Sequence, residues 1–427
     1  MRQPRRDEDA IRIGKLGNGL TVVTELIPAV KTATIGLWVA AGSRHERQDE
    51  HGLSHLIEHM AFKGTERRSA RRIAEDIENV GGDINAATST EFTSYSARVL
   101  GENVDLAIDV LGDILTGSLF DPVELAREVN VILQEYASVE DTPDDLVMDV
   151  FMERAFAGQA IGRPILGTPE TIQRFDAAAI RAFMDREYTP DRMVMAATGA
   201  VDHDAVMTAA EAALGGIAAR AAPDLPVASY TGGDGRMRRR LEQANLVLGL
   251  PGVSFRDPAY FATHMFAQAL GGGLTSRLWH EVREQRGLAY SVDAFHWPFG
   301  DCGLFGIGAG TSKSDLAEVV DVMADTARKA AEDLDETEIA RTKAQLKVSL
   351  LAALETPGGR AERAARQLLS WGRIIPAEET VAQVDAVGRD EVRAAGRRVL
   401  SGPLTLAAIG PIAALPTRNR IAAALSA

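Results

Sequence analysis

The chain has 427 residues, of which 46% are hydrophobic and 25% charged, with 39 Gly and 17 Pro. This composition excludes a disordered or fibrous protein, and the length exceeds what one hydrophobic core usually organises, so we expect two domains of about 200 residues each. The formal net charge of -14 argues against nucleic acid or a membrane surface as the main partner, because both are anionic and repel a negative field.

Cysteine usage and apolar runs indicate the compartment. The single cysteine, Cys302, excludes an intramolecular disulfide and a thiolate metal cage, which fits a reducing environment. The first ten residues turn acidic where an export signal needs apolar residues, and apolar runs such as 34–42 are shorter than the roughly 18 residues of a membrane span. We therefore expect a cytoplasmic protein without a membrane segment.

The first elements along the chain alternate between strands and helices. Residues 20–40 hold two clusters of β-branched residues, which predict two strands. A helix is expected at about 52–62, and a second helix from an N-cap at Ser69 to the pair Gly81-Gly82.

Residues 83–99 are rich in Thr, Ser and other strand formers and predict two strands with a turn near Ser89. Helices dominate from there to about residue 190. One of them begins at Asp121, an N-cap followed by proline, and runs to about Val139. Residues 193–198 predict a further strand.

The domain boundary is expected where the composition changes. Residues 217–236 are rich in Gly, Ala, Pro and Asp, which is typical of a linker. We therefore expect an N-terminal domain at 1–216, a linker at 217–236 and a C-terminal domain at 237–427.

The second half resembles the first at an offset of 209 residues, because segment 168–183 is similar to segment 377–392. The same offset sets His55 on His264, but Glu58 and His59 then face Ala and Gln. Chance similarity between two α+β halves is the alternative, and two separated blocks at one offset favour a duplication. Only the first copy would then keep its chemistry.

The helix at 52–62 carries polar residues on one face. At 100° per residue, His55, Glu58 and His59 lie together, opposite a stripe of Leu, Ile and Met. Two histidines four residues apart can bind one zinc ion, and the glutamate between them is suited to hold a water on that metal and take its proton. The alternative is a solvated helix face, and His51, on the same face, is a competing ligand.

A catalytic zinc ion needs a third protein ligand. The helix at about 122–139 offers Glu128 and Glu135, which are two turns apart and lie on one face. An ordinary solvated acidic helix would show the same spacing, so the residues alone leave the third ligand open.

The motif His55-x-x-Glu58-His59 and its surroundings resemble the inverted-motif zinc peptidases of the pitrilysin and insulin-degrading enzyme family, and within it the mitochondrial processing peptidase and its bacterial relatives. The resemblance spans most of the chain. It implies an α+β fold of two homologous domains, each a mostly antiparallel sheet packed with helices. It also implies that Glu135, 76 positions after His59, is the third ligand and that Glu128 is the acidic residue that supports the site.

Two further segments resemble family motifs. Residues 81–88 match an edge strand where Asn85 and Ala86 contact an extended substrate, although an ordinary turn and strand is the alternative. Residues 271–290 match a signature whose Arg283 and Tyr290 hold the substrate carbonyl and the developing oxyanion. A charged helix surface and a core tyrosine are the alternative for that pair.

The resemblance implies a zinc endopeptidase with one Zn²⁺ per chain that cuts extended or presequence-like peptides, and the acidic charge favours basic ones. Since the chain has only two domains, we expect a homodimer that encloses a chamber, in which Arg283 and Tyr290 complete the partner's site. One alternative is a non-catalytic assembly subunit like the core proteins of the respiratory bc1 complex. A peptide-binding module with structural zinc is weaker, because Glu58 would have no purpose.

Overall fold

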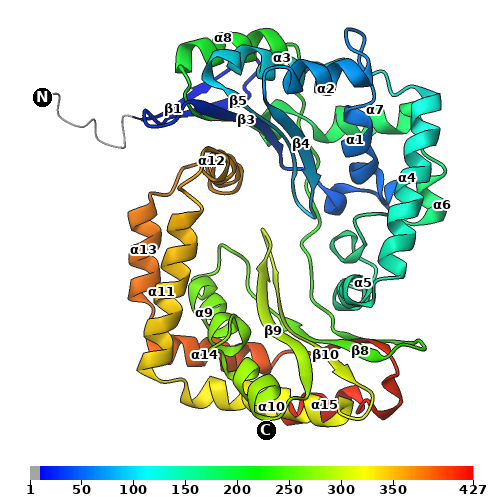
Figure 1. Ribbon diagram of the computed structural model, residues 1–427, viewed down its shortest axis with the longest axis vertical. Helices are drawn as coiled ribbons and strands as arrows, with labels where there is room; N and C mark the ends of the chain where they lie inside the picture. Colours follow the sequence, from blue (N-terminus) through cyan, green and yellow to red (C-terminus); the bar gives the residue numbers. More distant parts are fainter. Residues whose placement is uncertain (1–9, 427) are drawn as a thin grey trace, which may run out of the picture. The chain divides into compact units, whose positions relative to one another are not determined.

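The computed structural model describes residues 10–426, which form two compact units (Figure 1). The expectation about an export signal therefore concerns residues that, except for Ala10, lie outside this description. The first unit combines the chain up to Tyr136 with residues 165–225 and 351–375, and the second combines residues 137–164, 226–350 and 376 onward. The first unit thus includes residues 351–375, which follow the expected linker, and the second includes residues 137–164, which precede it. No helix within residues 10–426 is long and apolar enough to cross a membrane.

The first unit is built on a six-stranded sheet in the order β1-β2-β6-β3-β5-β4. All neighbours are antiparallel except β2 and β6. Every residue of β6 is buried, because helices cover both faces of the sheet centre. The strands are β1 (Ile11–Lys15), which the sequence analysis did not predict, β2 (Thr21–Leu26), β3 (Thr32–Val39), β4 (Asp83–Thr88), β5 (Thr93–Leu100) and β6 (Met193–Gly199).

Helices α3 and α8 pack on one face of this sheet, and α12 packs on the other. Ala361, Ala364 and Ala365 of α12 lie against the second face, where Val23 and Trp38 are buried. The helices of the unit are α1 (Leu53–Ala61), α2 (Ala70–Glu78), α3 (Val104–Thr116), α4 (Pro122–Glu140), whose last turn lies in the second unit, α6 (Pro169–Ile172), α7 (Ala177–Glu187), α8 (His203–Leu214) and α12 (Pro357–Trp371).

The predicted elements appear at the expected places. The helix predicted at 52–62 is α1, and Ser69 caps α2 as predicted, since its Oγ accepts a hydrogen bond from the Arg72 amide at 3.2 Å. The turn near Ser89 joins β4 to β5. The helix predicted to begin at Asp121 is α4, and Asp121 Oδ1 accepts from the amide of Val123 at 2.8 Å.

The second unit contains a five-stranded sheet in the order β7-β11-β8-β10-β9. Helices α9, α10 and α14 build the core on one face, and α5 covers the other. The strands are β7 (Gly233–Arg238), which begins inside the expected linker, β8 (Gln243–Pro251), β9 (Ala289–Pro298), β10 (Gly303–Ser312) and β11 (Thr405–Gly410). The helices are α5 (Pro143–Ala155), α9 (Tyr260–Gly271), the π-helix η7 (Trp279–Gln285), α10 (Leu316–Asp333), α11 (Glu336–Ala352), α13 (Ala377–Ala386), α14 (Arg389–Leu400) and α15 (Arg418–Ser426).

The two sheets repeat one topology, which confirms the prediction of two homologous, mostly antiparallel α+β units. Strands β2, β6, β3, β5 and β4 correspond to β7, β11, β8, β10 and β9 in the same spatial order. The single parallel pair, β2 with β6, recurs as β7 with β11. Strand β8 begins 211 residues after β3, close to the expected offset.

The helices that cover the second face of each sheet are exchanged between the halves of the sequence. Helix α5, from the first half, packs on β11, β8 and β7, while α12, from the second half, packs on the corresponding strands β6, β3 and β2. The ring of Phe151 in α5 lies directly on Gly249 of β8, where a Cβ atom would stand 1.9 Å from it. Close packing therefore requires glycine at position 249.

Candidate metal centre

The N-terminus of α1 is held by a buried carboxylate. Glu46 Oε2 accepts a hydrogen bond from the Gly52 amide at 2.9 Å, and Oε1 accepts one from the Ser54 amide at 2.7 Å. Gly52, with φ of 94°, turns the chain sharply into the helix. Because these amides begin the helix, Glu46 satisfies donors that have no partner within the helix and complements its positive end.

One face of α1 packs in the core and the other carries the chemistry, as the periodicity indicated. Leu53, Leu56, Ile57 and Met60 are buried in the core of the first unit. His55 and His59 lie on the opposite side, with ring centroids 4.6 Å apart. The apolar face fixes the helix, so the two imidazoles project from a rigid element.

His55, His59 and Glu135 of α4 converge. One ligand atom from each lies within 4.8 Å of the others. Glu135 Oε2 is 3.8 Å from His55 Nε2 and 3.6 Å from His59 Nε2. Ligands about 2.1 Å from a tetrahedral ion lie about 3.4 Å from one another. Two imidazoles and one carboxylate at these separations therefore fit a zinc ion with an open fourth position.

The histidines present the atoms that a metal needs. Burial and the neighbouring His59 lower the pKa of His55 to about 4, so its imidazole is neutral at pH 7. His59 Nδ1 lies 3.1 Å from Glu128 Oε2, which leaves its Nε2 toward Glu135. A carboxylate on the far ring nitrogen fixes the tautomer and the orientation of a ligating histidine.

Glu128 is held in turn by Lys63. Glu128, in α4, is buried. Its Oε1 forms an ion pair at 2.7 Å with Nζ of Lys63, a residue just past the end of α1. Lys63 compensates the charge that Glu128 would otherwise carry alone in a buried position. The structure thus places Glu128 where the resemblance implied a supporting residue, behind His59.

Glu58 lies on the same helix between the two histidines. Its Oε2 is buried and has no hydrogen-bond partner within residues 10–426. The hydroxyls of Tyr95 and Tyr188, which lie 3.0 Å apart, interact electrostatically with Glu58. Burial and the negative charge of Glu58 raise the pKa of Tyr188 to about 12, so both phenols stay neutral. An orphaned carboxylate oxygen beside a cluster of metal ligands is suited to accept a proton from water.

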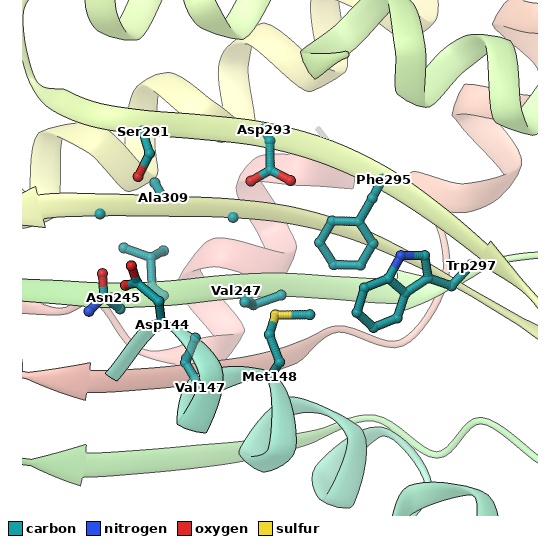
Figure 2. Close-up of a pocket in the computed structure, with 13 residues that line it drawn as sticks. Asp144, Val147, Met148, Asn245, Val247, Ser291, Asp293, Phe295, Trp297 and Ala309 are labelled. Atoms are coloured by element: carbon teal, nitrogen blue, oxygen red, sulfur yellow. The ribbon is translucent and has the colours of Figure 1, made fainter. Parts of the chain in front are cut away.

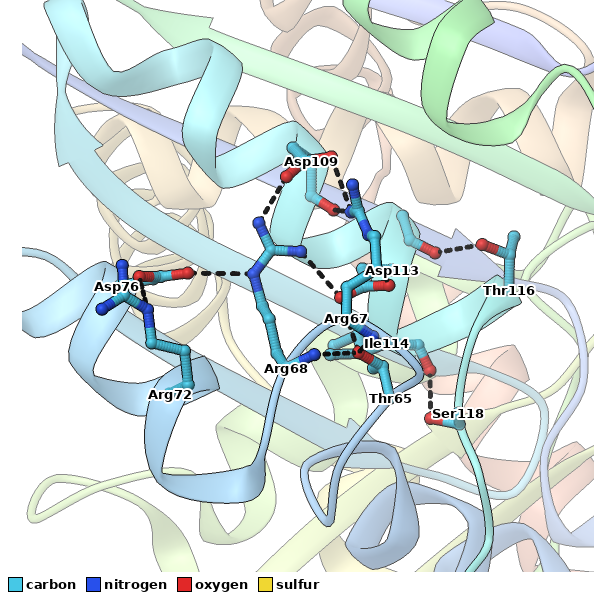
Figure 3. A network of polar contacts seen from close by, with 11 residues as sticks. Thr65, Arg67, Arg68, Arg72, Asp76, Asp109, Asp113, Ile114, Thr116 and Ser118 are labelled. Carbon is cyan, nitrogen blue, oxygen red and sulfur yellow. Dashed lines mark hydrogen bonds and ion pairs between the residues drawn. The ribbon is translucent and has the colours of Figure 1, made fainter.

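The loop after Lys63 is fixed by a buried polar network (Figure 3). Thr65 Oγ1 donates to Asp113 Oδ2 at 2.8 Å. Arg68 pairs with Asp76 at 2.9 Å, with Asp113 at 2.7 Å, and with Asp109. Although burial opposes it, hydrogen bonds from Arg68 and Thr65 hold the pKa of Asp113 below its usual value. The network ties α2 and α3 to the segment that carries Lys63.

The strand proposed to bind substrate lies at the edge of the sheet. Asn85 and Ala86 are in β4, which has β5 as its only strand neighbour among the described residues. Strand β4 contacts α1, and Thr88 Oγ1 donates to the Ser54 carbonyl at 3.4 Å. Asn85 is exposed. One edge of the β4 backbone therefore has no strand partner in residues 10–426 and lies next to the helix of the candidate centre.

Arg283 and Tyr290 are neighbours in the second unit. The Arg283 guanidinium lies 4.9 Å from the centre of the Tyr290 ring and 4.1 Å from that of Trp279. In the β9–β10 register, Ala289 pairs with Thr311 and Ser291 with Gly310, so Tyr290 is the extra residue of a bulge. The bulge turns the phenol outward, and 75% of Tyr290 is exposed. The alternative of a core tyrosine is therefore wrong.

His51 does not lie on the face of α1 as the spacing suggested. The helix begins at Leu53, after the left-handed turn at Gly52, and His51 is buried outside the group of ligand atoms. Glu46 and Lys63 were not predicted from the sequence. Lys63 follows His59 by one helical turn, which was a usable signal, whereas nothing in the sequence connects Glu46 with amides six and eight residues later.

An inverted His-x-x-Glu-His helix with a carboxylate from a second helix, on the first of two repeated α+β units, defines a class of metallopeptidase folds. The chain belongs to peptidase family M16, the insulinase family. The insulinase profile matches residues 21–169, and the profile of the peptidase M16 inactive domain matches residues 174–346. This confirms the family that the motif indicated.

Relatives that align over almost the whole chain are described as uncharacterized zinc proteases. An uncharacterized zinc protease of Streptomyces coelicolor is 41% identical over 94% of this chain and 90% of its own. Another from Bacillus subtilis is 35% identical over 94% and 98%. Similar solved structures include a chain of complex III2 from Candida albicans with Inz-5 bound, at 24% identity, 97% and 99% coverage and a TM-score of 0.85. A peptidase M16 inactive domain from Pseudomonas fluorescens has 22% identity, 94% and 98% coverage and a TM-score of 0.84. These two structures show the fold alone.

Proposed function

We propose that the chain is a zinc-dependent endopeptidase that binds one Zn²⁺ through His55, His59 and Glu135. The observation that carries this proposal is the convergence of three ligand atoms within 4.8 Å beside a glutamate whose buried Oε2 has no partner in residues 10–426. The zinc proteases among the relatives support the same activity. When bound, zinc supplies a Lewis acid that polarises a carbonyl and acidifies water.

The residues of the chain divide the remaining work. Glu58 accepts a proton from the attacking water while the water oxygen bonds to the scissile carbonyl carbon, and then delivers that proton to the departing amine. Glu128 holds His59 in orientation. Asn85 and Ala86 on the edge strand bind the substrate as an added strand, which selects extended peptides and reads little of their sequence.

We further propose that two copies form a homodimer around a chamber and that the partner's Arg283 and Tyr290 hold the carbonyl oxygen. A guanidinium and an exposed phenol are both donors suited to a developing oxyanion. Mixing Glu58→Gln chains with Tyr290→Phe chains tests this arrangement. Heterodimers should recover part of the activity, and no recovery would contradict completion of the site in trans.

The substrates are proposed to be extended peptides, with basic ones favoured by the net charge of -14. The single cysteine supports a cytoplasmic location. Nucleic acid and membranes are not expected partners. The decisive experiment is cleavage of a basic presequence-like peptide by zinc-loaded protein. Chelator and Glu58→Gln should each abolish cleavage, while Glu78→Gln, an exposed change in α2, should not.

A non-catalytic assembly subunit is the second candidate, favoured by the likeness to a chain of complex III2. That likeness concerns the fold, and a scaffold has no need of converging ligands. If zinc-loaded protein cleaves no peptide, or cleaves only at a rate that Glu58→Gln leaves unchanged, the scaffold function is preferred. Metal analysis should find one zinc per chain in wild type and a large loss in Glu135→Ala.

A further inference from the structure

The π-helix η7 brings side chains five residues apart into contact. Trp279 Nε1 donates a hydrogen bond to Glu284 Oε1 at 3.2 Å. His280 and Gln285 form a second such pair, with their Nε2 atoms 2.8 Å apart. In an α-helix, residues five apart point about 140° away from each other, whereas the i→i+5 hydrogen bonds of a π-helix place them on one face. The π-helix therefore lets Trp279 contact Glu284 in addition to Arg283, its neighbour four residues along the chain.

Arg283 is held by the faces of two rings and not by a charged partner. Its guanidinium carbon lies 4.1 Å from the centre of the Trp279 ring and 4.9 Å from that of Tyr290. Within residues 10–426 the guanidinium forms no hydrogen bond and no ion pair. A carboxylate partner would occupy the N–H donors and offset the charge, whereas a ring contacts the face of the guanidinium and leaves its edge free. Arg283 therefore keeps its donors and its charge for a ligand.

Tyr290 is fixed by the bulge near the start of β9. Ser291 and Asp293 lie on the side of β9 that lines an open pocket of about 360 Å³ beside α5 (Figure 2). Ala289 and Val292 are both buried in the core on the opposite face. Strict alternation does not allow this, because side chains three residues apart in a strand point to opposite faces. The bulge therefore takes Tyr290 out of the alternation, and its ring meets the guanidinium there.

We propose that Trp279, held by Glu284, is a positioning residue that fixes the face of the Arg283 guanidinium and leaves its N–H donors for the oxygen of a substrate carbonyl. The proposal rests on the proposed peptidase function and adds a residue to its oxyanion site. A free arginine side chain samples many rotamers, and fixing it before the reaction removes that cost from the transition state. Glu284 acts one step further away, because its carboxylate fixes the plane of the indole.

The first test observes Arg283 by NMR in the full-length protein without substrate. Protons above a ring face resonate upfield, so the δ-methylene protons of Arg283, observed with isotope-labelled arginine and assigned by Arg283→Lys, should be shifted upfield in the wild type. Trp279→Leu should remove most of this shift, and Trp279→Phe, which keeps an aromatic face, should retain most of it. Glu284→Leu should reduce the shift, whereas Glu284→Gln, which keeps an acceptor for the indole N–H, should not. An Arg283 resonance that is the same in the wild type and in Trp279→Leu overturns the proposal.

The second test measures kcat and KM separately, with zinc-loaded protein and a presequence-like peptide. Because an oxyanion develops only in the transition state, Trp279→Leu should lower kcat about tenfold and change KM less than about twofold. Trp279→Phe should restore kcat to within about threefold of the wild type. Trp371→Leu, which removes a 43% exposed tryptophan at the end of α12, is the control and should change neither constant.

A double substitution separates positioning from a general structural role. In protein that already carries Arg283→Leu, adding Trp279→Leu should cost little further activity, because the group that Trp279 positions is gone. A second loss as large as the one in the wild-type background overturns the proposal, since Trp279 would then act independently of Arg283.

The outcomes for the two proposals are distinct. If the wild type cleaves peptides and Trp279→Leu cleaves them equally well, the positioning role is wrong and the peptidase function stands. If the wild type cleaves no peptide, the peptidase function is wrong, and loss of the upfield shift in Trp279→Leu would still confirm that Trp279 fixes Arg283.

Discussion

Lys63 Nζ lies 2.7 Å from Glu128 Oε1, and the other oxygen of that carboxylate lies 3.1 Å from His59 Nδ1. The lysine therefore acts on the candidate zinc ligand through one intervening group. It compensates the charge of the buried Glu128 carboxylate, and a hydrogen bond from Nδ1 to that carboxylate leaves His59 Nε2 available as a ligand atom.

Replacing Lys63 with methionine should weaken zinc binding by about 10- to 100-fold, the usual effect of losing such a supporting partner. Competition with a chromophoric chelator measures this directly. Lys63→Arg should restore most of the affinity because it retains the charge. Unchanged zinc affinity in Lys63→Met, with the protein folded, would show that Glu128 needs no counter-charge.

Glu46→Gln should destabilise the start of α1, because an amide group presents one acceptor oxygen where two backbone donors need partners. Loss of a satisfied buried donor costs about 1–3 kcal/mol. Chemical denaturation should show this loss, and hydrogen exchange should show faster exchange at Gly52 and Ser54. Glu78→Gln in α2 is the matched control and should leave both measurements unchanged.

The Arg68 network should contribute to stability more than an exposed ion pair. Arg68→Met leaves Asp109 and Asp113 with Arg67 and Asp76 with Arg72 as their remaining partners, so we expect a loss of about 1–3 kcal/mol. Arg71→Met removes only the ion pair of Arg71 with Glu75. The Arg71 side chain is 85% exposed, so this change should cost less than about 0.5 kcal/mol. Equal effects in thermal denaturation would contradict this ranking.

His45 should make the protein sensitive to acid. Burial, together with the positive charges of Arg192 and Arg44, lowers the pKa of His45 to about 3. The unfolded chain therefore binds a proton below about pH 6.5 that the folded chain does not bind, and stability falls as the pH falls. Linkage gives a loss of about 2 kcal/mol between pH 7 and pH 5 from this residue.

His45→Asn tests this, because asparagine retains an acceptor for the Gly42 amide, which now donates to His45 Nδ1 at 3.1 Å. The free energy of unfolding of the variant should change less between pH 7 and pH 5 than that of wild type. His280→Asn, an exposed change, should retain the wild-type pH dependence. A variant that remains as sensitive to acid as wild type would mean that other groups dominate.

Local pattern predicted much of this structure, since the apolar stripe of α1, the Ser69 cap and the strands depend on neighbours in sequence. The partnership of His59 with Glu135 depends on where two separate helices meet, and only the family spacing indicated it. The bulge that turns Tyr290 outward comes from a one-residue mismatch between strands, which composition does not reveal. Nor does an amphipathic pattern specify which sheet a helix covers, so the exchange of α5 and α12 was not predicted.

That exchange has a consequence for synthesis on the ribosome. The second face of the first sheet, with Val23 and Trp38, is buried by residues 357–371, which are translated long after the sheet itself. A nascent chain stopped within residues 217–236 therefore exposes an apolar surface that it has no means to cover. Each half of the chain therefore needs the other half to fold. Half-chains should aggregate or bind chaperones unless both halves are produced together.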